Sequence, residues 1–92
     1  MHDKLVDQLH NTYVKKNADY GDSFGKTYKD LGMISAITRI SDKFNRLISL
    51  ATKPNDQQVM DESIIDTLMD MANYCVMTVM EIEIQNKKVE DK

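Results

Sequence analysis

The segment from Val59 to Gln85 limits the fold of this 92-residue chain more than any other segment. It contains neither Gly nor Pro, and its apolar side chains recur every three or four residues, which predicts one long α-helix. These side chains wrap most of the helix circumference; they are Ile64, Ile65, Leu68, Met69, Met71, Ala72, Cys75, Val76, Met77, Val79, Met80 and Ile82. A helix that is apolar all round must be buried on several sides. The other helices are too short to cover it, so we expect a second copy of the chain to pack against it.

Two further amphipathic helices are expected, over residues 3–16 and 34–50, from the same three- and four-residue spacing. Between them, Asp22 or Ser23 can cap a short helical turn that ends at Gly32. Its aromatic side chains are expected to cap a small core; they are Phe24 and Tyr28. A second connection is expected at Lys53-Pro-Asn-Asp, where Pro54 disfavours helix in the residue before it.

The sequence therefore predicts an all-α fold, a compact bundle of three main helices plus a short helical turn, completed by oligomerisation. Residues 1–92 are expected to form a single domain, with an ordered core over about 3–85 and a solvated tail over 86–92. The lone Cys75 lies in an apolar stripe and is expected to be a small core residue, since it has no partner for an internal disulfide.

Composition excludes several classes of protein. No apolar run approaches the roughly twenty residues of a membrane span, and the amino end lacks the layout of a signal peptide. The net charge of −3 disfavours binding to a DNA duplex, which needs many phosphate contacts. We therefore expect a cytoplasmic protein with no membrane partner.

The charges are segregated along the chain. Residues 15–53 carry eight basic and four acidic side chains, whereas residues 54–86 carry seven acidic and no basic ones. The basic stripe Arg39, Lys43 and Arg46 matches the spacing of a polar stripe formed by Glu62, Asp66, Asp70 and Asn73. If these two helices pack together, the two stripes form a salt-bridge network, a grip for phosphate, or a Mg²⁺ site on the carboxylates.

An aromatic side chain accompanies the bases. Tyr20 is expected in a polar loop that begins at Asn17, near Ser23 and Lys26. A ring beside basic side chains is what stacking on a nucleobase requires. Neither His2 nor His10 shares a helix face with other ligand types, so we expect neither to bind metal or to act in catalysis.

Three blocks of sequence together resemble a known family. They are KNADYGDSF (16–24), SAITRISDKFNRL (35–47) and DESIIDTLMDMANY (61–74). They are similar to the first nucleotide-modification-associated domain family, small helical proteins common in phages and prophages of Gram-positive bacteria. The resemblance implies a role connected with nucleotides and does not specify a reaction.

The third block has a weaker similarity to the all-α NTP pyrophosphatases of the MazG type, which hold Mg²⁺ with acidic residues from two neighbouring helices. That likeness implies a metal site at Glu62, Asp66 and Asp70. The second acidic set of those enzymes is replaced here by Arg39, Asp42, Lys43 and Arg46. Three bases with one acid disfavour a multi-metal centre and favour phosphate binding without metal.

We therefore expect a nucleotide-binding protein without catalysis or cofactor, of the kind that a phage uses as a sponge for cyclic-nucleotide immune signals in the host cytoplasm. The expected binding residues are Tyr20, Ser23, Lys26, Arg39, Lys43, Arg46, Asp66, Asp70 and Asn73. One alternative is a Mg²⁺-dependent nucleotide pyrophosphatase. Another is a helical oligomer whose charges are only structural.

Overall fold

A computed structural model describes the backbone of residues 1–52 and 57–90 and the side chains of residues 1–19, 21–52 and 61–88. This part of the chain forms four helices, α1 (His2–Tyr20), α2 (Ser23–Leu31), α3 (Met33–Thr52) and α4 (Gln57–Glu90), and contains no strand. The predicted all-α class is confirmed. The predicted connection at residues 53–56 lies outside the described residues.

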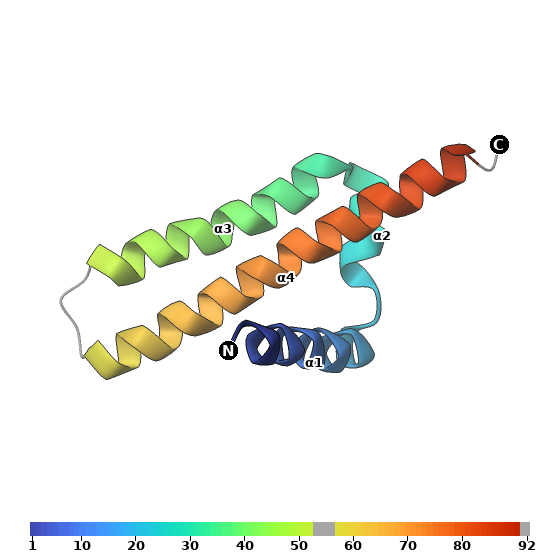
Figure 1. Cartoon of the computed structure of the whole chain (residues 1–92). Coiled ribbons are helices and arrows are strands. Elements are labelled where there is room, and N and C mark those ends of the chain that lie inside the picture. Colours follow the sequence, from blue (N-terminus) through green and yellow to red (C-terminus); the bar gives the residue numbers. More distant parts are fainter. Residues whose placement is uncertain (53–56, 91–92) are drawn as a thin grey trace.

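The long helices α3 and α4 lie side by side and antiparallel, and they form the body of an elongated molecule of 54 × 27 × 24 Å (Figure 1). The short α2 contacts both of them near the start of α3, and α1 contacts α4 on a separate side. The chain thus has one two-helix layer, with α1 and α2 placed against it.

The turn between α1 and α2 begins later than the sequence predicted. Helix α1 continues to Tyr20, so the loop expected from Asn17 onward is wrong in its start. The break comes at Gly21, whose φ of 66° and ψ of −158° are open essentially to glycine alone. Asp22 then caps α2 as predicted, because its carboxylate accepts a hydrogen bond from the Gly25 backbone N–H at 3.2 Å.

The carboxyl end also differs from the expectation. Helix α4 runs to Glu90, so it extends beyond the predicted end at Gln85 into the segment expected to be a solvated tail. Lys87 and Lys88 occupy its last turn, where positive charge is favoured by the helix dipole. Residues 86–88 are exposed, as expected of a solvated end.

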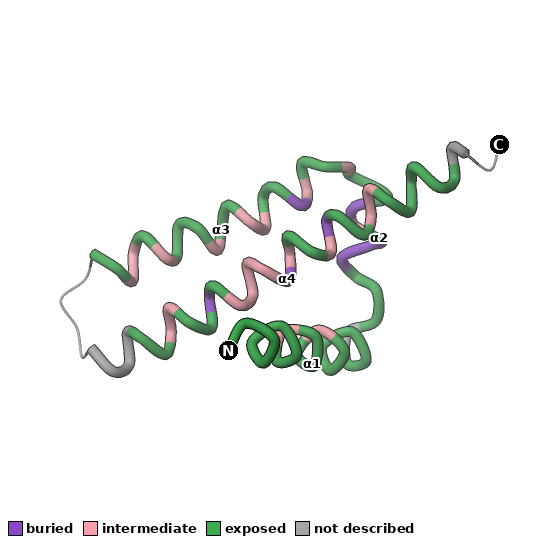
Figure 2. Tube along the Cα trace, in the orientation of Figure 1, coloured by how far each residue is buried: buried purple, intermediate pink, exposed green. Residues whose placement is uncertain are grey.

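The core lies where α2, α3 and α4 meet. Phe24, Tyr28 and Ala36 are buried there, and Tyr74 and Met77 of α4 pack against them (Figure 2). The predicted core role of the two aromatic residues of α2 is confirmed. Cys75 is exposed, so its predicted place in the core of the chain is wrong. The reason is that α4 has more apolar positions than the other helices of one chain can cover.

Most apolar positions of α3 and α4 outside this small core are only partly covered, as the green and pink stretches of Figure 2 show. No helix of the described residues is both long enough and apolar enough to cross a bilayer.

Candidate functional site

A cavity of about 340 Å³ lies beside the core, between the α1–α2 turn and the helices α3 and α4. All four helices contribute to its wall. The chain turns at Gly21, so that the last turns of α1 and the first turn of α2 line the same space. The lining residues are Tyr13, Lys16, Asn17, Gly21, Ser23, Phe24, Arg39, Asp70, Asn73, Tyr74 and Met77.

Arg39 is held against two aromatic rings in the wall of this cavity. Its guanidinium carbon lies 5.9 Å from the ring centre of Phe24 and 5.9 Å from that of Tyr74. The two rings stack on each other, with centres 5.9 Å apart and planes 27° from parallel. These cation–π contacts orient the guanidinium without neutralising it. Arg39 lines the cavity, and no described carboxylate lies within ion-pair distance of it.

Asp70 joins α1, α3 and α4 through two lysines. Its Oδ1 accepts a hydrogen bond from Lys16 Nζ at 2.9 Å, and its Oδ2 accepts one from Lys43 Nζ at 3.2 Å. Both oxygens of the carboxylate are thus engaged by ammonium groups. Burial raises the pKa of Asp70, but the hydrogen bonds and positive charges of Lys16 and Lys43 outweigh that effect, and the pKa lies below its ordinary value.

The lowered pKa predicts an acid-sensitive contribution to stability. A carboxylate whose pKa is lower in the folded state than in the unfolded state stabilises the fold fully above its unfolded pKa, which for Asp70 is about 3.8. As the pH falls below that value, this contribution decreases, and it is gone once Asp70 is protonated in the folded state too. We expect the melting temperature of the wild type to fall more steeply between pH 5 and roughly pH 2 than that of Asp70→Asn. Equal slopes in melting curves recorded over this range would contradict the assignment.

Asn73, which lines the cavity from α4, also contacts α1. Its Nδ2 donates a hydrogen bond to the backbone oxygen of Leu9 at 3.2 Å, and the residue is buried. Because a carbonyl oxygen can only accept, this bond sets which way the amide points. It leaves Oδ1 of Asn73 as a positioned acceptor on a residue that lines the cavity.

A second, shallower depression of about 440 Å³ adjoins the cavity and shares Arg39 and Tyr74 with it. Its other lining residues are Asp42, Lys43 and Arg46, all on α3. Because three basic side chains and one acidic side chain line it, this depression favours binding of a negatively charged group. Arg39 stands at the boundary between the two spaces.

The structure gathers six of the predicted binding residues around these two spaces. Ser23, Arg39, Asp70 and Asn73 line the cavity, whereas Lys43 and Arg46 line the depression. Lys26 and Asp66 are exposed and line neither. The side chain of Tyr20 lies outside the described residues, although its neighbour Gly21 lines the cavity.

The residues expected to hold Mg²⁺ are not brought together. Glu62 and Asp66 are exposed on α4, and only Asp70 of that set reaches the cavity. Among the described side chains, those of residues 1–19, 21–52 and 61–88, no group of three or more His, Cys, Asp or Glu is arranged to hold a metal ion.

Several residues that line the cavity were not predicted from the sequence. Lys16 and Asn17 open the first sequence block, but the loop was expected to start there, and no pattern linked Lys16 to Asp70. Tyr74 could have been predicted as a site residue, because it follows Asp70 by one helical turn and so shares its face. Tyr13 and Met77 fit apolar stripes and carried no sign of a site.

Comparison with known proteins agrees with the first of the two similarities seen in the sequence. No curated protein and no solved structure matches the chain. A family model, nucleotide modification associated domain 1, matches residues 16–82, which is more than two thirds of the chain. Apart from Tyr13, every residue lining the cavity and the depression lies within the matched range. The chain belongs to the nucleotide modification associated domain 1 family.

Proposed function

We propose that this protein binds a nucleotide across the cavity and the adjoining depression without breaking it down. The observation that carries the proposal is Arg39, which is oriented by Phe24 and Tyr74 at the boundary between the two spaces and has no ion-pair partner among the described residues. The membership of a nucleotide-associated family supports the same ligand class.

The two spaces suit the two chemical halves of a nucleotide. The cavity volume of about 340 Å³ falls in the range of roughly 300–1,000 Å³ typical of small-molecule sites, and its wall combines aromatic rings with amides. A base in it can stack on an aromatic ring and hydrogen-bond to Oδ1 of Asn73. We assign the same stacking role to Tyr20, which precedes Gly21 of the cavity wall.

The depression suits the phosphates. Arg39 and Arg46 can each present two parallel N–H donors to a phosphate, and Lys43 adds a point charge. Asp70 limits the repulsion among Lys16, Lys43 and Arg39 while the site is empty of phosphate, since it contacts both lysines.

The contacts of Asp70 support nucleotide binding without hydrolysis. Both oxygens of the Asp70 carboxylate already accept hydrogen bonds from ammonium groups, an arrangement for charge balance and not for metal ligation. The remaining acids of the predicted metal set, Glu62 and Asp66, are exposed elsewhere on α4. In a phage-encoded protein, such binding would sequester a cyclic-nucleotide immune signal of the host, and this sponge role is the finer form of the proposal.

A thermal-shift panel tests the proposal. The ligands are NTPs, mononucleotides and cyclic di- and trinucleotides, each with and without Mg²⁺, and each recovered and analysed by chromatography. A ligand at 100 times its Kd should raise the melting temperature by roughly 10 °C, with or without metal, and should be recovered intact. Failure of every nucleotide to shift the melting temperature would contradict nucleotide binding. Mg²⁺-dependent release of diphosphate from an NTP would show a pyrophosphatase instead.

A further inference from the structure

We propose that a second copy of this chain covers an apolar face formed by α3 and α4 on the side away from the cavity, which makes the protein a symmetric dimer with a four-helix centre. This inference is independent of the proposed nucleotide site. It starts from the large apolar side chains that the described part of one chain leaves about half exposed. The most exposed of them are Ile34, Ile37, Phe44 and Ile48 on α3 and Ile65, Leu68, Val76 and Val79 on α4; Met33, Met80 and Ile84 are less exposed.

These eight side chains lie in one stripe along each helix. On α3 the stripe is spaced three, four, three and four residues apart when Ser41 is included. On α4 the stripe from Ile65 to Val79 is spaced three, four, four and three residues apart when Ala72 is included. A spacing that averages 3.5 residues is the seam along which helices pack in coiled coils and four-helix bundles. Neither stripe contains a charged side chain.

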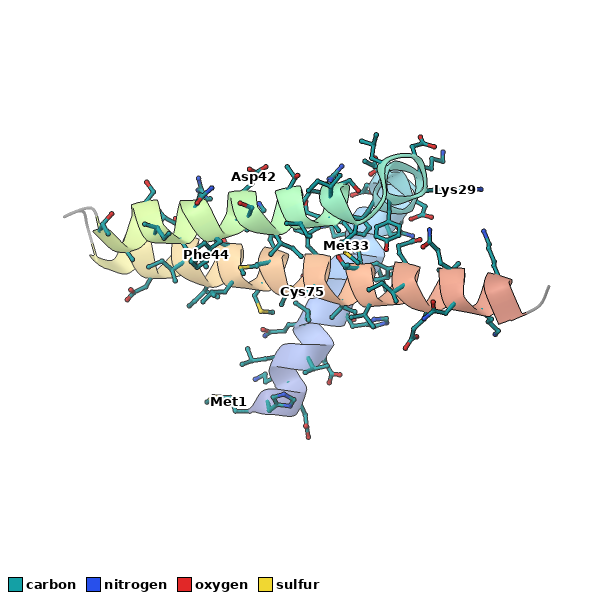
Figure 3. All side chains as sticks on the ribbon, turned by 90° about the horizontal axis from the view of Figure 1, so that it is seen from above. Met1, Lys29, Met33, Asp42, Phe44 and Cys75 are labelled. Carbon is teal, nitrogen blue, oxygen red and sulfur yellow. The ribbon has the colours of Figure 1, made fainter. Side chains whose placement is uncertain are left out.

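The two stripes form one surface. The ion pair between Lys43 and Asp70 sets the register of the antiparallel helices. In that register Ile34 lies level with Val79, and Ile48 lies level with Ile65. The helical period places both stripes on the side of the layer opposite Arg39 and Asp70. Figure 3 shows α3 and α4 side by side over this length, with Phe44 and Cys75 labelled.

The size of this face favours a partner. The eight side chains are between 48% and 65% exposed. Half of a large apolar side chain is roughly 80 Å², so the face presents roughly 650 Å² of apolar surface. This exceeds the roughly 300–600 Å² of the largest apolar patch on a typical monomer and approaches the roughly 800 Å² that each partner buries in a standard interface.

A second copy fits this face better than an unrelated partner does. An interface with twofold symmetry pairs a patch with itself, so it needs a surface complementary to its own copy. A flat, uncharged pair of antiparallel helices with seam spacing meets that need, because two such layers interlock as a four-helix bundle. The small Ser41 and Ala72 stand at the middle of the two stripes and let the layers approach closely.

Sedimentation velocity on the full chain tests the proposal. We expect the mass of two chains for the wild type and the mass of one chain for Phe44→Glu, because a charge in the seam would be buried against the partner copy. Thr38→Glu is the matched control; it adds the same charge to an exposed position of α3 outside the stripe, and it should remain a dimer. A monomeric wild type, or a Phe44→Glu variant with the wild-type mass, would overturn the proposal.

Two measurements on the wild type keep the test decisive if Phe44→Glu does not fold. The melting temperature of a dimer that unfolds to single chains should rise by roughly 3 °C for each tenfold increase in concentration. Cys75 is exposed in one chain and lies beside Val76 and one helical turn before Val79 of the stripe, so it should react more slowly with a thiol reagent as the concentration rises. A melting temperature and a labelling rate that are both independent of concentration would exclude the dimer. A dimer in which Cys75 stays fully reactive would place the interface elsewhere.

Discussion

Replacing both Arg39 and Lys43 by alanine is expected to weaken nucleotide binding by roughly 100- to 10,000-fold, because each side chain gives up charge-assisted hydrogen bonds worth about 1.5–3 kcal/mol. Arg39 contributes most of the loss. Its guanidinium is already oriented by the rings of Phe24 and Tyr74, so little entropy is lost when it binds phosphate. Lys43 lines the depression from the same helix, one turn further on.

Isothermal titration of the best ligand from the thermal-shift panel measures this effect. The matched control is Lys29→Ala with Lys87→Ala, which removes two positive charges from exposed positions outside both spaces and should change the affinity less than threefold. Arg39→Lys separates charge from geometry, since it keeps the charge and loses the planar fork. We expect it to bind roughly tenfold more weakly than the wild type. Unchanged affinity in the double alanine variant would refute the proposed site.

Tyr28→Ala is expected to lower the free energy of unfolding by about 3–4 kcal/mol, the cost typical of deleting a buried aromatic side chain. Tyr28 is 4% exposed and belongs to a cluster of three buried apolar residues, with Phe24 and Ala36, that joins α2 to α3 and α4. A cluster of three residues has too few side chains to repack into the space that the Tyr28 ring would leave. Since domains of this size have a total stability of only about 5–15 kcal/mol, the variant should be close to unfolding at 37 °C.

Urea denaturation followed by circular dichroism at a fixed protein concentration measures this loss. Tyr28→Phe is the control, because it retains the buried ring and should cost less than about 1 kcal/mol. A loss below about 1 kcal/mol for Tyr28→Ala would mean that the cluster does not hold α2 in place. The cavity depends on that placement, since Ser23 and Phe24 of α2 form part of its wall.

The helices were predictable because helical periodicity is a local property. The spacing of apolar residues located all four helices, and Asp22 was a correct cap. Their ends were less predictable, because polar residues such as Asn17 and Asn86 are compatible with both helix and loop. Only the backbone conformation required of Gly21 decided where α1 ends.

The candidate site was predictable in part for the same reason. Arg39, Lys43 and Arg46 share a face of one helix, and Asp70 and Asn73 share a face of another, so helical spacing alone paired the two groups. The contact of Asp70 with Lys16 joins residues 54 positions apart. No periodicity in the sequence connects positions on two helices that do not follow each other, and Lys16 was therefore missed.

The sequence by itself determined that this chain is all-helical, that α4 has more apolar surface than one chain can bury, and that bases share one face of α3 while acids share one face of α4. Each of these follows from local spacing along a helix, which depends on neighbouring residues alone. The tertiary structure decided that α1 closes the cavity, that Arg39 lies against two rings, and that Cys75 faces outward. Those features depend on how helices orient about one another, which is set by packing between distant segments.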